Sequence, residues 1–422
     1  MNKRRCRRLS IESLESRRVF AGPIDTLSRN DVEIAYVGRY SPAISTPVVW
    51  TGNTSGCVAG TINQAATDAT LATINFFRNM SGVNDVVLDE AYSRKAQQAA
   101  LMMQAQNALS HTPTQPWACY SAEGVEAAGR SNFALGATAP RAIKAYVEDS
   151  GGGNTAAGRR RWIQYPFMDR MGSVSTSGAN ALWVFTPFFN QRSPDWVAWP
   201  PAGYVTRDLV FPRWSLSRDD ADFSGASVTM TLNGNNLTLQ TSSVQNGYGL
   251  NTLVWEPNNL VLPTDGTDAT IKVTVNNVIV NGVSQNSQYD VIAIKPPTGA
   301  LSIQLAQQSV PENAGVVADF VTLSRIGGDS TKALQVTLAS SDETEAILPQ
   351  FVTIPAGVSQ IRVALTAVND SIIDGDQLVT ITATANDFSA VSKRFVVSDD
   401  DRHTQPSPWQ NAMNWTRRGL AV

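Results

Sequence analysis

The sequence predicts a multidomain protein in which one α+β domain is followed by two antiparallel β-sandwiches. Three observations lead to this prediction. The chain has 422 residues, which is too long for one ordinary hydrophobic core. Apolar residues recur at helical spacing in part of the first half, and helices there alternate with short apolar runs typical of strands, which favours a layered α+β domain. In the second half, apolar and polar residues alternate with a period of two, as in half-buried strands.

We expect six segments along the chain. They are an export leader (1–22), an extended lead-in (23–64), the α+β domain (65–190), a first β-sandwich (191–297), a second, immunoglobulin-like β-sandwich (298–402) and a disordered or truncated tail (403–422).

The composition narrows the classes of function. A net charge of -3 and a pI near 5.6, with no basic stripe carrying interleaved aromatic residues after the leader, argue against a nucleic-acid partner. Only 16% of the residues are charged, against about a quarter in ordinary proteins, which favours β-structure exposed outside the cell. No apolar run reaches the length of about 18 residues that spans a membrane, so we expect no transmembrane segment.

The leader MNKRRCRRLSIESLESRRVFAG is basic, but it lacks the apolar stretch of about 7 to 15 residues that an ordinary signal peptide carries. Taken alone it could be a basic amphipathic helix or a disordered arm. Its pattern R-R-L-x-x-E-x-L-E-x-R-x-x-x-A resembles a leader motif of large exported bacterial proteins, and the resemblance implies export.

Capping and breaking residues predict the helices and a strand of the α+β domain. A helix capped by Asp68 is expected to end at Ser81-Gly82, and one capped by Asp89 to stop at Ser110 because prolines follow. A third helix is expected from Pro140 to Glu148, and a strand over residues 181–185.

Candidate chemistry in this domain centres on His111, because the only other histidine is His403. Glu123, Glu126, Glu148 and Asp149 are acids that could face the same cleft. No H-E-x-x-H, C-x-x-C or G-x-S-x-G motif occurs. Ser110 or Ser121 could still form a Ser-His-acid arrangement with His111, but a structural or polar cleft residue is the favoured interpretation of this histidine.

Four spaced motifs in this region share one resemblance. LSHTP at 109–113, W-x-C-Y at 117–120, E-x-x-E-A-A-x-x-S-N at 123–132 and G-R-R-R-W at 158–162 resemble the CAP superfamily of cysteine-rich secretory, antigen 5 and pathogenesis-related (SCP-like) proteins in its bacterial form. The resemblance implies an α-β-α sandwich with a ligand-binding cleft.

The same resemblance assigns the cleft residues. It matches His111 to the family's first histidine, Glu126 to the first acid and Glu148 to the second. Arg159 stands where the second histidine belongs, and this departure argues against a zinc site of the family type. Arg159 could instead pair with Glu126 or Glu148, while the rest of the arginine run is expected to form a solvated or carboxylate-paired face.

Three cysteines stand at positions 6, 57 and 119. Since Cys6 lies in the leader, Cys57 and Cys119 are either a disulfide or two buried thiols. The family resemblance favours the disulfide.

The first β-sandwich carries no ionisable cluster beyond Asp219, Asp220 and Asp222, but it is rich in tryptophan. Trp196, Trp199 and Trp214 are candidates for sugar stacking, yet packing of the seam between two domains is the favoured alternative, because large aromatic side chains normally bury their area.

The second β-sandwich contains about seven short strands, and its turns VPENAG, SSDETE, IPAG, VNDSIIDGDQ and SDDD resemble the Calx-beta family. Calcium takes oxygen ligands, mostly carboxylates and carbonyls, and such turns can converge at one end of a sandwich. The resemblance implies these calcium ligands: Glu312, Asp342, Asp370, Asp374, Asp399, Asp400 and Asp401. Asn369 and Gln377 replace acids common in the family, so the expected affinity is weak, about millimolar to tens of micromolar. The alternative is a set of solvated turn carboxylates.

We therefore expect a secreted, cell-surface or envelope binding and adhesion protein that uses calcium, with an extracellular protein, lipid or glycan as partner. Binding is favoured over catalysis. The alternatives are a CAP-type extracellular hydrolase or protease that uses His111 and Glu126, and a purely structural envelope protein.

Overall fold

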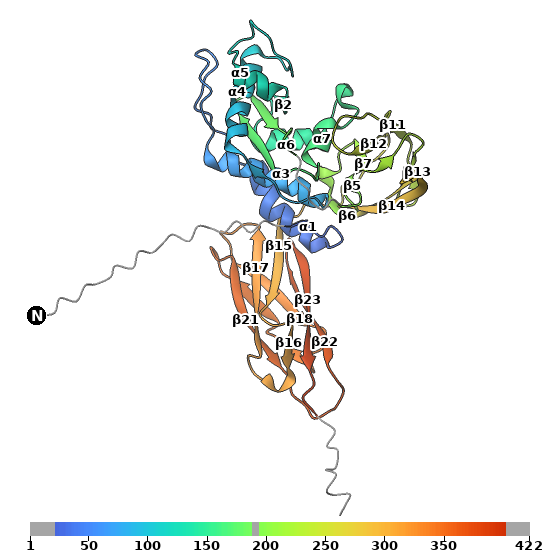
Figure 1. Cartoon of the computed structure of the whole chain (residues 1–422). Coiled ribbons are helices and arrows are strands. Elements are labelled where there is room, and N and C mark those ends of the chain that lie inside the picture. The colour runs from blue at the N-terminus through green and yellow to red at the C-terminus, as the bar shows by residue number, and fades with distance from the viewer. Residues whose placement is uncertain (1–21, 188–193, 402–422) are drawn as a thin grey trace, which may run out of the picture.

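The computed structural model describes residues 22–187 and 194–401, and Figure 1 shows the arrangement of their helices and strands. The predicted leader, the predicted tail and the boundary expected between residues 190 and 191 lie outside the described residues. The helices are α1 (Arg29–Ala35), the π-helix η1 (Tyr36–Tyr40), α2 (Ser41–Ile44), α3 (Gln64–Met80), α4 (Glu90–Gln106), α5 (Ala122–Ala128), α6 (Ala139–Glu148) and α7 (Gly158–Ile163), with short 3-10 turns η2 (Gly152–Asn154), η3 (Arg207–Leu209) and η4 (Glu312–Ala314).

The strands form three groups along the chain. The first group is β1 (Val87–Leu88), β2 (Ser131–Leu135), β3 (Arg170–Ser175) and β4 (Ala179–Trp183). The second is β5 (Val197–Trp199), β6 (Gly203–Thr206), β7 (Trp214–Arg218), β8 (Ala221–Asp222), β9 (Ser227–Leu232), β10 (Asn235–Asn236), β11 (Leu239–Thr241), β12 (Asn251–Pro257), β13 (Ala269–Val280) and β14 (Val283–Ile294). The third is β15 (Gly299–Leu305), β16 (Ser309–Pro311), β17 (Asp319–Gly327), β18 (Leu334–Ser340), β19 (Ala346–Ile347), β20 (Phe351–Ile354), β21 (Gln360–Ala367), β22 (Gln377–Ala385) and β23 (Phe388–Ser398).

The predicted helices of the α+β domain are present, with two corrections at their ends. The side chain of Asp89 accepts a hydrogen bond from the backbone of Tyr92 and caps α4 as expected. However, α3 begins one turn before Asp68, after Asn63. Helix α4 ends at Gln106 rather than at Ser110, because Asn107 adopts the left-handed conformation with φ 52° and closes the helix.

The lead-in expected to be extended is partly helical, and this prediction was wrong for α1, η1 and α2. Ser28 caps α1 through the backbone N–H of Asp31. Tyr40 at the end of η1 is buried, and its ring lies 4.9 Å from the ring of Phe76 on α3. The segment folds as helices because its apolar residues pack onto α3 at helical spacing.

The first group of strands forms a sheet in the order β1-β3-β4-β2, with helices on both faces. Alternate residues of β4 face opposite sides. Ala181 and Trp183 pack with α4 and α5, whereas Leu182 packs with α3 and α6. The expectation of a layered α+β domain is therefore correct.

The second group forms a β-sandwich of two sheets, ordered β10-β9-β13-β14-β6 and β11-β12-β7-β5. Its core is continuous with the core beneath the first sheet. Trp199 and Trp214 are both buried, and the Trp199 ring lies 5.2 Å from the ring of Phe77 on α3. Two of the three tryptophans thus pack inside, and Trp199 fills the seam between the two parts.

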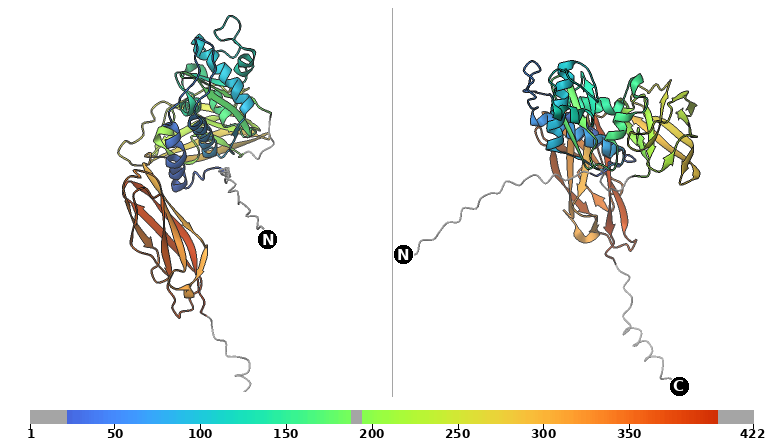
Figure 2. Two further views of the ribbon diagram at one scale, coloured as in Figure 1. Left: turned by 90° about the vertical axis from the view of Figure 1, so that its left-hand side faces the viewer. Right: turned by 45° about the horizontal axis from the view of Figure 1, so that its top comes forward.

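The third group forms a separate sandwich with its own core, with strand order β19-β21-β17-β15-β23-β22-β18-β20. Figures 1 and 2 show it extending away from the rest of the molecule, next to α1. Asn30 of α1 donates a hydrogen bond to the carbonyl of Leu301 on β15 at 3.1 Å. Within the described ranges, no helix is long and apolar enough to cross a membrane.

Candidate functional sites

A cavity of about 540 Å³ surrounds His111 in the α+β domain. Nδ1 of His111 lies 3.0 Å from the backbone carbonyl of Ala128. Because a carbonyl oxygen only accepts hydrogen bonds, Nδ1 carries the proton and Nε2 keeps the lone pair in the neutral ring. The ring of Phe133 packs beside the imidazole at 5.4 Å.

The two predicted acids do not line this cavity. Glu126 bonds to Lys95 at 2.6 Å, and this hydrogen bond, with the nearby positive charge, lowers the pKa of the carboxyl. Glu148 lies 3.8 Å from Lys144 one helical turn earlier on α6. The structure therefore brings His111, Glu126 and Glu148 into one domain, but it does not place them around one cavity.

Asp149, one of the four acids expected to face the cleft, does not line the cavity and pairs with Arg159 instead. Its side chain is fully buried, and it accepts hydrogen bonds from Arg159 at Nε (2.7 Å) and at the backbone N–H (3.0 Å). Arg159 was expected to pair with Glu126 or Glu148, so its observed partner is a correction. The sequence offered one signal for the position of this acid. Asp149 stands at the end of α6, shortly before three glycines, where a residue in the left-handed backbone conformation closes the helix.

The rest of the arginine run fastens the α+β domain to the second strand group. Arg160 is fully buried and donates to the carbonyl of Arg213 (2.8 Å) and to Oγ of Ser215 (3.0 Å). Arg161 donates to the carbonyls of Gln245 and Leu250. A solvated or carboxylate-paired face, as the sequence predicted, is therefore wrong for these two arginines.

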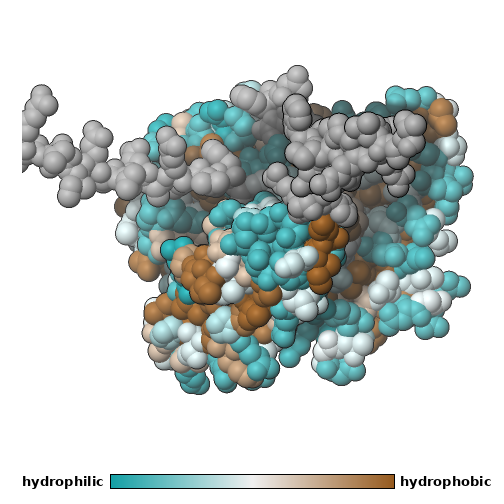
Figure 3. All heavy atoms as spheres, turned by 90° about the horizontal axis from the view of Figure 1, so that it is seen from below, coloured by the Kyte–Doolittle hydropathy of each residue, from teal (hydrophilic) through white to brown (hydrophobic). Residues whose placement is uncertain are grey.

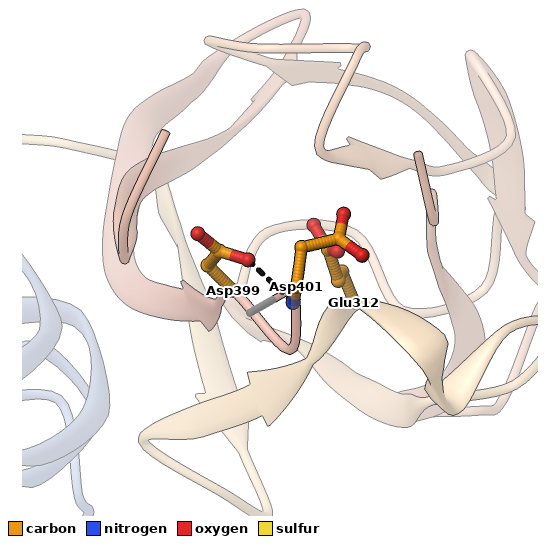
Figure 4. A group of neighbouring side chains, drawn as sticks. All are labelled: Glu312, Asp399 and Asp401. Carbon is orange, nitrogen blue, oxygen red and sulfur yellow. Dashed lines mark hydrogen bonds between the residues drawn. The ribbon is translucent and has the colours of Figure 1, made fainter. Parts of the chain in front are cut away.

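A second candidate site lies at the end of the C-terminal sandwich. Oxygen atoms of Glu312, Asp399 and Asp401 all lie within 4.8 Å of one another, and this is the one such cluster among residues 22–187 and 194–401. Figure 4 shows the three carboxylates gathered where η4 meets the chain beyond β23. Glu312 is only 3% exposed.

Two oxygens in this cluster lack a hydrogen-bond donor. Oε1 of Glu312 and Oδ2 of Asp401 are buried with no partner in the described part of the chain. Burial, together with the neighbouring carboxylates of Asp370, Asp399 and Asp400, raises the pKa of Glu312 to about 7. Burial and the same surroundings also raise the pKa of Asp401.

Backbone hydrogen bonds hold the cluster in shape. Asp399 accepts the N–H of Asp401 through Oδ1 at 2.7 Å and the N–H of Gly375 through Oδ2 at 2.9 Å. The second bond ties the turn between β21 and β22 to the end of β23. Asp400 accepts from the side chain of Asn313 next to Glu312.

The remaining predicted ligands lie around this core. Asp370 and Asp374 are close enough to act electrostatically on Asp401, and Asp370 accepts the backbone N–H of Ile372. Asp342 bonds to the backbone N–H and the hydroxyl of Thr344, which lowers the pKa of its carboxyl.

Glu345 belongs to the same surroundings and was missed by sequence reasoning. It is 6% exposed, and burial, with the charges of Asp374, Asp342, Asp370 and Asp399, raises its pKa. Its position in SSDETE, three residues after Asp342, was the only signal available.

Large aliphatic side chains are exposed in the segment after η4, in the turn between β21 and β22 and at the start of β22. Val316 is 81% exposed, Ile372 is 62% exposed and Leu378 is 60% exposed. Figure 3, which views the molecule from below Figure 1, shows apolar patches among hydrophilic side chains on that face. Exposed apolar groups that gather in one place are typical of interaction surfaces.

The predicted disulfide is present between Cys57 and Cys119. It ties the loop before α3 to the segment between α4 and α5, which also carries His111.

Comparison with known proteins supports the α+β part of the predicted resemblance. The model of the cysteine-rich secretory protein family, CAP, matches residues 71–186. No curated protein matches the chain.

Solved structures resemble parts of the chain at low similarity. An apo-form Calx CBD1 domain is 20% identical with a TM-score of 0.21, over 24% of this chain and 99% of that one. A β-glucuronidase of glycoside hydrolase family 2 is 15% identical with a TM-score of 0.20, over 45% of this chain and 19% of that one. A β-glycosidase from Bacteroides vulgatus is 11% identical with a TM-score of 0.18, over 44% of this chain and 22% of that one. The chain thus spans less than a quarter of either glycosidase, and TM-scores this low carry no argument about its fold or activity.

Proposed function

We propose that this chain is a secreted or cell-surface binding and adhesion protein, with a ligand-binding cleft in its CAP-like domain and a calcium-binding, Calx-beta-like C-terminal sandwich. The observation that carries the proposal is the gathering of Glu312, Asp399 and Asp401, two of whose buried oxygens have no donor among the described residues. Ionised carboxylates this close repel one another unless a cation or a proton intervenes.

The donor set favours calcium over zinc. Calcium binds six to eight oxygen atoms from carboxylates, carbonyls and water, whereas structural zinc sites use cysteine and histidine. The cluster contains only carboxylates, and Asp370, Asp374 and Asp400 lie close enough to add to its negative charge. Bound calcium would join η4, the turn after β21 and the end of β23.

Three features support a location outside the cell. The disulfide between Cys57 and Cys119 fits an oxidising compartment. The leader resembles that of exported bacterial proteins, and exposed aliphatic side chains around the acidic cluster fit a binding surface for an extracellular protein, lipid or glycan. The geometry lends no support to a hydrolase based on His111 and Glu126, because Glu126 pairs with Lys95 outside the cavity.

The test is a thermal melt of the chain from residue 23, stripped of metal and then given calcium, magnesium or zinc separately. At a free calcium concentration about a hundredfold above the dissociation constant, binding to the folded state alone stabilises by about 2.7 kcal/mol. The double variant Asp399→Asn/Asp401→Asn should lose the calcium shift. Its matched control is Asp329→Asn. Asp329 is an exposed carboxylate in the turn after β17, whereas Glu312 lies before the start of β17.

Two results would contradict the calcium assignment. One is a melt that calcium leaves unchanged at concentrations well above the millimolar end of the expected affinity range. The other is an equal calcium shift in the wild-type chain and in the double variant.

A further inference from the structure

We propose that the cavity beside His111 binds a small organic acid, which has an aromatic or alkyl body and a carboxylate held by Arg159. The inference rests on the proposed binding role of this cleft and adds the class of its ligand. Four features of the cavity carry it: its charge, a buried hydroxyl, its aromatic walls and its cover.

Among the described residues, the one charged side chain in the cavity wall is a guanidinium that pairs with Asp149 on one side only. Arg159 lines the cavity, and no aspartate or glutamate does. Asp149 fixes the Nε side of the guanidinium, and within the described residues no hydrogen bond engages its two terminal amino groups. A planar guanidinium with two free N–H groups on one edge binds a carboxylate through paired hydrogen bonds.

A residue of the same wall carries a buried hydroxyl. Ser131 is 2% exposed and lines the cavity, and its Oγ has no partner among the described residues. Leaving a buried hydroxyl unpaired is unfavourable. A bound carboxylate oxygen would accept this hydrogen bond, so Ser131 and Arg159 are complementary to the same ligand group.

The remaining walls are aromatic. The rings of Trp162 and Phe185 meet edge to face at 4.4 Å, and both side chains line the cavity with Phe133. Phe185 is 41% exposed, so its ring offers uncovered area to a ligand. Ligand sites typically combine such apolar walls with a few placed polar groups.

The cover of the cavity comes from the second strand group. Gln245 and Tyr248 line the cavity, although they lie outside the stretch that matches the CAP family. Arg161 holds this loop by donating to the carbonyl of Gln245 at 2.8 Å, and its guanidinium lies 5.5 Å from the centre of the Tyr248 ring.

Gly158 permits this close approach. A Cβ at this position would lie 2.6 Å from Tyr248, so a larger residue would push the loop away. The volume of about 540 Å³ lies within the range of roughly 300 to 1,000 Å³ that is usual for small-molecule sites. The volume and the lining from both parts of the chain therefore fit a small molecule.

The test compares two probes that share a body and differ in charge. Binding of 4-phenylbutyrate and of 4-phenylbutan-1-ol to the chain from residue 23 is measured by calorimetry and by Trp fluorescence. We expect the acid to bind at least about tenfold more tightly than the alcohol, which corresponds to about 1.4 kcal/mol. Arg159→Gln should remove this preference, whereas Arg141→Gln, on the exposed side of α6, should keep it.

A second pair of variants separates loss of binding from loss of folding. Since Arg159→Gln leaves Asp149 buried without its cation, the double variant Asp149→Asn/Arg159→Gln removes both charges, and its fold is checked by its melt. Asp149→Asn alone should still prefer the acid, because Arg159 remains. Tyr248→Ala should weaken both probes.

Three results would overturn the proposal. They are equal binding of acid and alcohol, a preference for the acid that survives in the folded double variant, and no binding of either probe at millimolar concentration. None of these results bears on the calcium assignment, because the acidic cluster lies in the C-terminal sandwich and is tested by its own thermal melt. A lost calcium shift with a retained preference for the acid would instead reject the calcium assignment alone.

Discussion

Glu312 holds its proton more firmly in the folded chain than an ordinary glutamate does. Its side chain is nearly buried, one of its oxygens has no donor in the described residues, and carboxylates surround it. Burial is the largest cause of its raised pKa, and the charges of Asp370, Asp399 and Asp400 add to it. A metal-free chain near neutral pH therefore carries an unfavourable charge at this position.

The pH dependence of stability follows from this pKa. The folded value of about 7 lies above the ordinary 4.5, so the folded state binds more protons than the unfolded state between these values. Stability of the metal-free C-terminal sandwich should then fall as pH rises from about 4.5 to about 7. Melting temperatures across this window should show the fall in the wild-type chain and much less of it in Glu312→Gln.

Glu343→Gln is the matched control, because Glu343 is exposed. It should behave like the wild-type chain. The assignment fails if Glu312→Gln shows the same slope as the wild-type chain over this window.

At this scale, sequence reasoning found residues whose chemistry is local. The run Asp399-Asp400-Asp401 and Glu312 are acidic residues in turns, and β-sandwich geometry brings strand ends together, so their proximity could be expected. The pairing of Asp149 with Arg159 could not, because which of several acids faces an arginine depends on how the segment after α6 closes.

The element that joins the first two parts of the molecule is α7. Arg160 has no exposed surface and donates four hydrogen bonds outside its own helix, to the carbonyls of Val147, Glu148 and Arg213 and to Oγ of Ser215. Arg213 in turn donates to backbone carbonyls of the segment after α6, including that of Asp149. Arg160 of the α+β part therefore bonds to the second strand group, and Arg213 of the second strand group bonds to the α+β part.

Replacement of Arg160 by methionine should destabilise the α+β part and the second strand group together. The change keeps the apolar bulk but removes the donor from four acceptors, three of them in buried hydrogen bonds, and breaking such a buried network costs about 3 to 5 kcal/mol. Urea unfolding measures the loss, and Arg141→Met on α6 is the control, since Arg141 is exposed. A loss below about 1 kcal/mol would mean that α7 is not the joining element.

Sequence patterns predicted the elements that form from local signals. Asp89 caps α4, and alternating residues mark β13, because capping and strand alternation depend on neighbours in the chain. The helices of residues 29–44 were not predicted, because they depend on burial against α3. The role of α7 was missed for the same reason. A run of arginines does not by itself indicate whether the side chains will face water or be buried against a second part of the chain.

Most buried apolar residues of the described part of the chain fall into two large clusters. One core runs without a break from Val32 on α1 through the first sheet to Ala293 on β14. The other lies inside the C-terminal sandwich, from Leu301 to Val397. The predicted division between the α+β domain and the first β-sandwich therefore describes two kinds of strand pattern, whereas the packing joins them into one unit.

Calorimetry of the chain from residue 23 should accordingly show two transitions, because residues that share a core unfold together. Calcium should raise only the transition of the C-terminal sandwich, and Arg160→Met should lower only the other. Fragments test the same division. Residues 23–297 should fold and melt as in the full chain, whereas residues 23–187 should not, because without Trp199 the buried ring of Phe77 on α3 loses its cover. A cooperative melt of residues 23–187 near the melting temperature of the full chain would contradict this expectation. It would show that the α+β domain folds without the second strand group, although the two share a core.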